Sequence, residues 1–199
     1  MKESANSVVI GFPAEAAAEQ AVATLLRFIG EEPERDGLRD TPARVVKAWR
    51  EMTAGYDDDP AEILSRTFEE SSDEMIILRG ISFFSTCEHH MLPFYGQAVV
   101  GYLPGKVVGI SKLARLVTCF ARRLQIQERM TQEIAQTIQE VTDPVGVGVI
   151  CEARHFCMMM RGVEKQHSGT VTSAMLGAFR AQKETRDEFL SLVAERAKF

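Results

Sequence analysis

The chain has 199 residues, of which 45% are hydrophobic and 26% charged, and its formal net charge is −5 at pH 7. This size and composition suit one good core, with at most a small helical appendage. The negative charge does not favour nonspecific binding to nucleic acid, so an anionic substrate needs a local positive pocket. No apolar run reaches transmembrane length, and the N-terminus lacks the long apolar region of a signal peptide. We therefore expect a cytoplasmic protein that binds neither nucleic acid nor a membrane.

The first part of the chain predicts two helices. Apolar residues recur at helical spacing over residues 14–30, where Gly30 can end the helix. Thr41-Pro42 supplies an N-cap hydroxyl and a proline for the first helical position, which predicts a second helix over residues 41–52. Residues 57–73 are acidic and predicted to be irregular. We place a boundary there, between an N-terminal helical region (1–70) and the main domain (71–199).

The main domain alternates pairs of strands with a pair of helices. Strands are predicted over residues 75–78, 81–84 and 97–103, followed by helices over 111–123 and 125–141. Further strands are predicted over 145–153, 155–162 and 170–174, before a last helix over 183–197. This order implies an antiparallel sheet with two helices on one face, which is an α+β architecture. Because so small a sheet leaves open edges and an uncovered face, we expect the chain to oligomerise.

Cysteine and histidine gather in two segments. Cys87-Glu88-His89-His90 forms the first, and Cys157 lies beside His155 in the second, so that three of the four histidines fall here. Thiolate and imidazole are ligands that zinc prefers, and Cys-x-x-His places two of them on one turn. If the ligands are Cys87, His90 and Cys157, they number only three. A zinc site with three protein ligands keeps a position for water, which indicates hydrolytic chemistry rather than a structural site.

Two other interpretations of the cysteines remain open at this point. Buried cysteines often serve as small hydrophobic residues, and four of them allow three disulfide connectivities. A reducing cytoplasm disfavours disulfides. A structural zinc module that binds a partner protein would need a fourth ligand, for which Cys119 and Cys151 are available, but neither has zinc-like spacing to the others.

Several polar segments are candidates for substrate binding. Ser111, Lys112 and Arg115 lie at a predicted helix start, where free N–H groups and the dipole favour anions such as phosphate. Lys112 and Arg115 share one helix face, as do Arg44 and Lys47, although a solvated basic face explains the latter pair better. Arg161 follows an apolar run, where a charge often has an anionic partner.

Gln127 and Glu128 place an amide beside a carboxylate at the start of another predicted helix. A carboxylate can accept two hydrogen bonds from the edge of guanine, through its ring N–H and amino group. The helix dipole alone also favours a carboxylate there, and the local sequence favours this simpler interpretation.

Six segments taken together resemble one enzyme family. The chain is similar to GTP cyclohydrolase I through GLRDTPARVVKAWREMTAGY, STCEHHMLPFYG, VVGISKLARLV, RRLQIQERMTQEIA, EARHFCMMMRGV and TVTSAMLGAFR, in this order. These segments lie between about residue 20 and the C-terminal helix. The resemblance implies a T-fold domain behind an N-terminal helical region, and a toroidal homodecamer with active sites at subunit interfaces. It also implies Zn²⁺ as cofactor and a reaction of GTP with water that gives formate and 7,8-dihydroneopterin triphosphate, the first step toward tetrahydrofolate or tetrahydrobiopterin.

The resemblance also implies a role for each candidate residue. The zinc ligands would be Cys87, His90 and Cys157, and the proton-transfer residues His89 and His155. The guanine base would be read by Glu128, with Gln127 beside it. The triphosphate would be bound by Lys112, Arg115 and Arg161, with Arg44 contributed by another subunit. Ser111 would lie near the ribose. A T-fold enzyme of the pyruvoyl-tetrahydropterin synthase type is the alternative, but such enzymes use three histidines for zinc.

Overall fold

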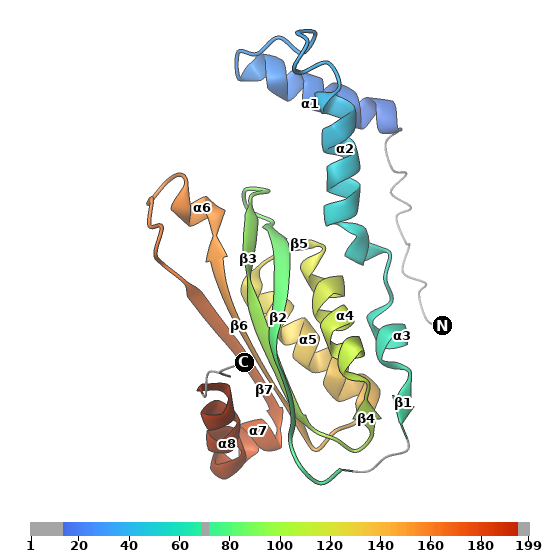
Figure 1. Ribbon diagram of the computed structural model, residues 1–199, viewed down its shortest axis with the longest axis vertical. Coiled ribbons are helices and arrows are strands. Elements are labelled where there is room, and N and C mark those ends of the chain that lie inside the picture. Colours follow the sequence, from blue (N-terminus) through green and yellow to red (C-terminus); the bar gives the residue numbers. More distant parts are fainter. Residues whose placement is uncertain (1–13, 69–71, 195–199) are drawn as a thin grey trace, which may run out of the picture. The chain divides into compact units, whose positions relative to one another are not determined.

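The computed structural model describes residues 14–68 and 72–194 (Figure 1). The chain divides into two compact units, Met1–Glu51 and Met52–Phe199, which we describe separately. The domain boundary predicted at residue 70 stays a prediction. None of the helices in the described part of the chain is long and apolar enough to cross a membrane.

The first unit holds the two predicted helices, α1 (Glu15–Phe28) and most of α2 (Thr41–Met52). Gly30 follows α1 with φ +90°, a left-handed conformation that favours glycine and stops the helix. The helix α2 begins at the predicted Thr41-Pro42 pair, but Thr41 is itself the first helical residue, so Pro42 takes the second helical position. Surface ion pairs connect α1 with the loop that follows it, such as Arg27 with Glu34 at 2.7 Å.

The second unit begins with η1 (Ala54–Tyr56), α3 (Pro60–Leu64) and β1 (Thr67–Phe68). The sequence predicted an irregular segment over residues 57–73, which was wrong for α3 and for the two residues of β1. The Asp59 carboxylate accepts hydrogen bonds from the N–H groups of Ala61 and Glu62, and Pro60 takes the first helical position. The short strand β1 pairs with β4 (Val107–Val108).

A five-stranded sheet forms the centre of this unit, in the order β5-β2-β3-β6-β7. Its strands are β2 (Ile76–Cys87), β3 (Pro93–Leu103), β5 (Leu124–Gln125), β6 (Gly146–His155) and β7 (Thr170–Gly177). Neighbouring strands are antiparallel except for β5, which pairs parallel to β2. The two strands predicted before residue 85 are one strand, interrupted by a register irregularity between Leu78 and Ile81 where Gly80 has φ +69°. As a result β2 continues to Cys87.

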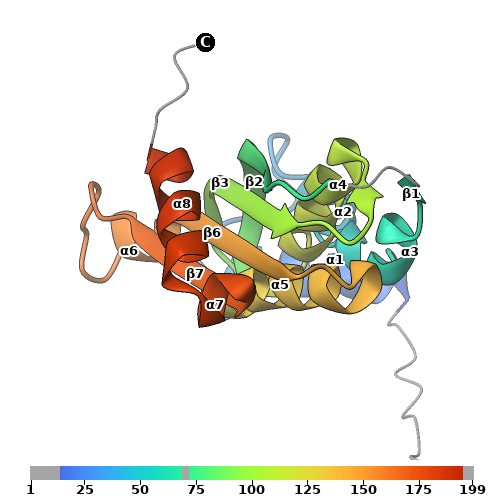
Figure 2. The same ribbon diagram turned by 90° about the horizontal axis from the view of Figure 1, so that it is seen from below.

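Two helices cover one face of this sheet, as predicted. The helix α4 (Ile110–Ala121) packs on β2, and α5 (Gln127–Thr142) packs on β6 and β7 (Figure 2). Their apolar sides and the facing strands form a closed core of fully buried residues, among them Leu113, Leu116, Ile134, Phe94 and Val149. These layers confirm the α+β architecture.

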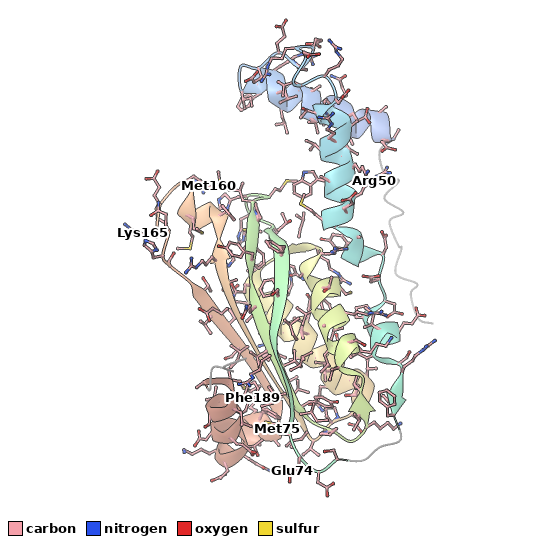
Figure 3. All side chains as sticks on the ribbon, viewed as in Figure 1. Arg50, Glu74, Met75, Met160, Lys165 and Phe189 are labelled. Atoms are coloured by element: carbon pink, nitrogen blue, oxygen red, sulfur yellow. The ribbon has the colours of Figure 1, made fainter. Side chains whose placement is uncertain are left out.

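The other face of the sheet is covered at one end by α8 (Lys183–Ala194), which follows α7 (Ala178–Ala181). Phe189 of α8 is fully buried there (Figure 3). Gly101 and Gly148 pair across β3 and β6, and a Cβ on them would lie 2.6 Å and 3.0 Å from the Phe189 ring. The paired glycines therefore open the space that Phe189 fills. The predicted final residues of this helix, 195–197, lie outside the described residues.

Candidate active site

The Cys87–His90 segment is a tight turn between β2 and β3. Cys87 is the last residue of β2, and its backbone N–H donates to the Leu92 carbonyl at 2.9 Å. The Met91 N–H donates back to the Cys87 carbonyl at 2.8 Å, and Met91 has φ +55°. A left-handed residue closes the turn sharply. The turn therefore fixes Cys87 at a strand end and leaves His89 and His90 at its tip.

Cys157 is presented by a helical turn. The strand predicted over residues 155–162 was wrong, because β6 ends at His155 and Phe156–Met159 form the short helix α6. A short apolar run fits a strand and a helical turn equally well, so its pattern could not decide between them. His155 thus ends β6 immediately before the turn that carries Cys157.

The fold brings Cys87, His90 and Cys157 together. One ligand atom from each lies within 4.8 Å of the others, so this group can hold a metal ion. Sulfur and nitrogen ligands at 2.0–2.3 Å from a tetrahedral ion lie about 3.5–3.8 Å apart, which small side-chain rotations reach from here. All four cysteines are free thiols, so the disulfide interpretation is wrong for this structure. Cys119 and Cys151 are not part of the group.

The surroundings of the group favour the protonated form of the Cys157 thiol. Burial raises the pKa of the Cys157 thiol, and the neighbouring Cys87 raises this pKa further, whereas Arg161 opposes the shift. A bound cation must therefore displace a proton that this thiol holds tightly. Arg161 Nη1 donates to His90 Nε2 at 3.0 Å, which places its guanidinium directly beside the turn.

His155 is held by Phe94 and Gln127. The imidazole stacks on the Phe94 ring with centroids 4.5 Å apart and planes inclined by 6°. Gln127 Nε2 donates to the backbone carbonyls of Cys151 and Thr170, both at 3.0 Å. Because carbonyls only accept, this fixes the amide orientation and turns Gln127 Oε1 toward His155 Nε2 at 2.8 Å. The Nε2 of His155 therefore carries the proton, and Nδ1 is free in the neutral ring.

The surroundings of His155 keep it neutral. Burial lowers the pKa of His155, while the nearby Glu128 carboxylate partly opposes this shift. Glu128 lies in the first turn of α5, directly after Gln127. The two residues that the sequence grouped together therefore do different things, since the side chain of Gln127 is 1% exposed and lies behind His155. The role of Gln127 follows from the hydrogen bonds of its buried amide to carbonyls of β6 and β7. No local sequence pattern indicates these bonds.

His89 lies beside Cys87. Its Nδ1 is 3.8 Å from Cys87 Sγ, and its ring lies edge-on to that of His90 with centroids 6.3 Å apart. The side chain is exposed at the tip of the turn. The imidazole is therefore accessible to a ligand bound at the cysteines.

Of the residues predicted to contact the substrate phosphates and ribose, Arg161 lies beside His90, whereas those on α4 lie elsewhere. Ser111, Lys112 and Arg115 occupy the first turns of α4, next to β4 and Tyr102, whose hydroxyl accepts from the Val108 N–H at 2.9 Å. The opposite end of α4 lies at the Cys87 end of β2, because the Phe120 carbonyl accepts a hydrogen bond from the side chain of Gln125, which pairs with Cys87 in the β2–β5 ladder. Nine residues of helix separate Ser111 from Phe120, about 14 Å along the axis. One chain does not bring these residues to the Cys87 group.

Arg44 belongs to the first unit. It lies on α2, where its exposed guanidinium donates to the Asp40 carboxylate at 3.0 Å. Such an exposed ion pair is easily exchanged for a ligand, because it contributes little to stability.

Comparison with known proteins agrees with this arrangement. Residues 18–194 match the family model of GTP cyclohydrolase I. The chain belongs to the GTP cyclohydrolase I family. A protein named GTP cyclohydrolase 1 from Synechococcus sp. (strain JA-2-3B'a(2-13)) is 56% identical over 181 residues, which cover 90% of this chain and 79% of the relative. A protein of the same name from Wolinella succinogenes is also 56% identical, over 176 residues, which cover 87% and 94% of the two chains.

Membership of the family confirms the resemblance seen in the sequence, and with it the T-fold and the enzyme class. A solved structure titled archaeosine synthase QueF-Like in the apo form aligns with 54% of this chain and 97% of its own, at 16% identity and a TM-score of 0.45. At that score the alignment carries no weight, and the fold assignment depends on the family and on the sheet topology described above.

Proposed function

We propose that this chain converts GTP and water to formate and 7,8-dihydroneopterin triphosphate, with Zn²⁺ held by Cys87, His90 and Cys157. The family match supports the reaction, and the observation that carries the site is the grouping of these three side chains within 4.8 Å. Two thiolates and an imidazole suit zinc better than magnesium or calcium. A zinc ion with three protein ligands keeps an open position and lowers the pKa of water to about 7, which supplies a nucleophile at neutral pH.

The same donor set speaks against the alternative pterin enzyme. A pyruvoyl-tetrahydropterin synthase uses three histidines, whereas this group contains one histidine and two cysteines. The product supplies either tetrahydrofolate or tetrahydrobiopterin synthesis. We further propose that the reaction takes place in the cytoplasm, where the four free thiols stay reduced.

Recognition of the base falls to Glu128. Its carboxylate stands at the start of α5, near His155, and can accept hydrogen bonds from both the ring N–H and the amino group of guanine. Adenine cannot supply this pair, because its edge reverses the donors and acceptors. A site built on such polar contacts rejects the unmatched analogue by about 10⁴–10⁵.

Proton transfer falls to the two histidines. Opening of the imidazole ring of guanine needs a nucleophile at carbon 8 and a proton on the departing nitrogen, and release of formate then cleaves an amide. His155 is neutral with Nδ1 free, so it can accept and return a proton at this atom. His89 beside Cys87 is the second such group. Gln127 acts through His155 as a positioning residue. Later steps at the ribose need acid–base groups near the sugar, for which we propose His155 and, from a neighbouring subunit, Ser111.

The triphosphate site requires more than one chain. Lys112 and Arg115 lie at the far end of α4 from the Cys87 group, so we propose that they bind the triphosphate of a GTP held at a neighbouring subunit. This requirement supports active sites at subunit interfaces, and we propose the homodecamer that the family resemblance implies as the assembly that forms them. Arg161 contributes from beside His90, and Arg44 is supplied by another subunit.

Glu128→Ala tests this assignment, with Glu140→Ala as the matched control on the same helix. Formate release should be measured with GTP and ATP over a range of concentrations. We expect wild type and Glu140→Ala to use GTP and refuse ATP, while Glu128→Ala loses most GTP turnover. Turnover of GTP by Glu128→Ala close to wild type would mean that Glu128 merely complements the helix dipole.

A further inference from the structure

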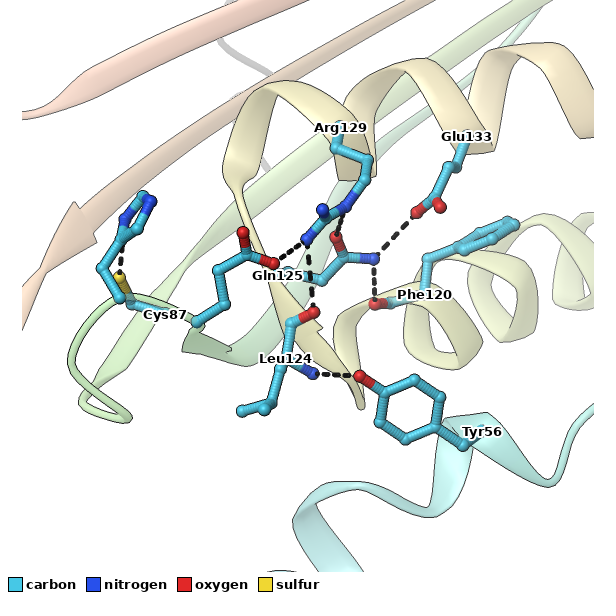
Figure 4. A network of polar contacts seen from close by, with 9 residues as sticks. Tyr56, Cys87, Phe120, Leu124, Gln125, Arg129 and Glu133 are labelled. Atoms are coloured by element: carbon cyan, nitrogen blue, oxygen red, sulfur yellow. Dashed lines mark hydrogen bonds and ion pairs between the residues drawn. The ribbon is translucent and has the colours of Figure 1, made fainter. Parts of the chain in front are cut away.

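A polar network lies behind the turn that carries the metal-binding residues (Figure 4). Arg129 Nη2 donates to the Glu88 carboxylate, and Arg129 Nε donates to Gln125 Oε1 at 3.2 Å. Glu88 belongs to the Cys87–His90 turn, and Arg129 belongs to the first turn of α5. The guanidinium therefore bridges two elements that each carry part of the proposed site.

The Arg129 guanidinium is oriented by the buried side-chain amide of Gln125. Gln125 is 2% exposed, and its Nε2 donates to the Phe120 carbonyl at 3.0 Å and to the Glu133 carboxylate at 2.8 Å. Both partners only accept, so Oε1 must face Arg129. The planar guanidinium donates through Nε to Gln125 and through Nη2 to Glu88, which fixes its direction in a way that a lysine cannot reproduce.

The network joins the two ends of the proposed site. Glu88 lies between Cys87 and His90 in the sequence, and Arg129 immediately follows Glu128. Between these segments the backbone is linked through the two-residue pairing of β5 with β2 and a hydrogen bond from the Glu88 N–H to the Gln125 carbonyl at 3.1 Å. The Arg129–Glu88 contact adds a side-chain link beside this short pairing, on the side of the turn that faces α5.

We propose that Arg129 is a positioning residue, which holds Glu88 and so keeps the Cys87–His90 turn at a fixed spacing from Glu128. The proposal rests on the proposed function for the roles of the metal ligands and Glu128. The side chains of Arg129 and Glu88 are 43% and 33% exposed, and ion pairs of this kind contribute little to global stability. The consequence of the pair therefore lies in the geometry of the site.

Arg129→Gln, Glu88→Gln and the double variant test the proposal. The control, Lys183→Gln, removes an exposed ion pair with Asp187 on α8. Zinc-loaded proteins should be challenged with a chelator, and we expect each single variant to hold zinc less tightly by up to about tenfold, because the pair lies beside the turn and contacts none of the three ligand side chains. The double variant should lose no more zinc affinity than the more affected single variant, because both substitutions remove the same contact. In steady-state assays kcat should fall while KM for GTP stays within about threefold, because Glu128 remains on α5.

A second readout does not depend on the reaction. In the metal-free protein, hydrogen exchange of the Glu88 and Met91 amides should be about tenfold faster or more in Arg129→Gln than in wild type or Lys183→Gln. Arg129→Lys keeps the charge but loses the planar guanidinium, so its amide exchange rates should lie between those of wild type and Arg129→Gln. It replaces Arg129→Gln in these measurements if that variant does not fold. The unfolding midpoint should shift by about 4 °C or less in each variant.

The proposal is overturned if both single variants retain zinc and protect these amides as wild type does, or if their losses add in the double variant. If wild type itself binds no zinc, the proposed function fails. The amide exchange rates then still decide whether Arg129 holds the turn.

Discussion

Replacing Gln127 with methionine tests whether this residue, bound to carbonyls of β6 and β7, positions His155 for proton transfer. The methionine keeps the length of the side chain but loses the hydrogen bonds of Gln127 Nε2 to two backbone carbonyls and to Thr172 Oγ1, and the one from His155. At about 1 kcal/mol net for each bond, we expect a loss of about 2–4 kcal/mol in the free energy of unfolding. His155 still stacks on Phe94 but can rotate in that plane, so turnover should fall up to about 10²-fold.

Urea unfolding of the metal-free protein and formate release by the zinc-loaded enzyme measure the two effects. Gln139→Met is the matched control, because Gln139 lies on the same helix and makes one hydrogen bond, to the Pro144 carbonyl at 3.0 Å, while its Oε1 is buried without a partner. This control should cost about 1 kcal/mol or less and leave turnover unchanged. If Gln127→Met loses no more stability than Gln139→Met, or turns over within about twofold of wild type, Gln127 does not position His155.

The remaining predictions concern the metal and the histidines. Cys157→Ser should lose both zinc and activity, because a site with three protein ligands tolerates no missing member, and full zinc occupancy in this variant would contradict the ligand assignment. His89→Ala and His155→Ala should retain zinc and GTP binding but turn over about 10²–10⁴-fold more slowly, whereas zinc loss in either would reassign that histidine as a ligand. Burial lowers the pKa of His155, so the unfolded state binds more protons as the pH falls below 6.5. Stability of the metal-free protein should therefore decline with falling pH from 6.5 down to the folded pKa, and less so in His155→Ala; equal pH profiles would show that His155 is not buried as described.

The local patterns of the sequence predicted most of the fold. Thr41-Pro42 and Gly30 marked helix ends correctly, because capping depends on the chemistry of a few adjacent residues. The strand predicted over residues 155–162 was wrong, because an apolar run of this length has no periodicity that distinguishes a strand from a helical turn. The packing of Phe189 against Gly101 and Gly148 could not be predicted either, because these two glycines become neighbours only when β3 pairs with β6.

The site divides in the same way. Cys87, His90 and Cys157 were recognisable because thiols and imidazoles are rare and chemically specific, and the fold does bring them together. Gln127 was grouped with Glu128 because they are adjacent in sequence, whereas its amide is directed at His155 by carbonyls of β6 and β7. The distance between Lys112 and the Cys87 group is likewise a property of the sheet and of α4, which no motif contains.

Zinc titration of the metal-free protein, with formate released from GTP measured at each step, tests the central claim most directly. We expect formate release to be absent without metal, to rise in proportion to bound zinc and to reach its maximum at one zinc per chain. Formate release from GTP at full rate without zinc, or one zinc bound per chain with no formate released, would contradict the proposed function.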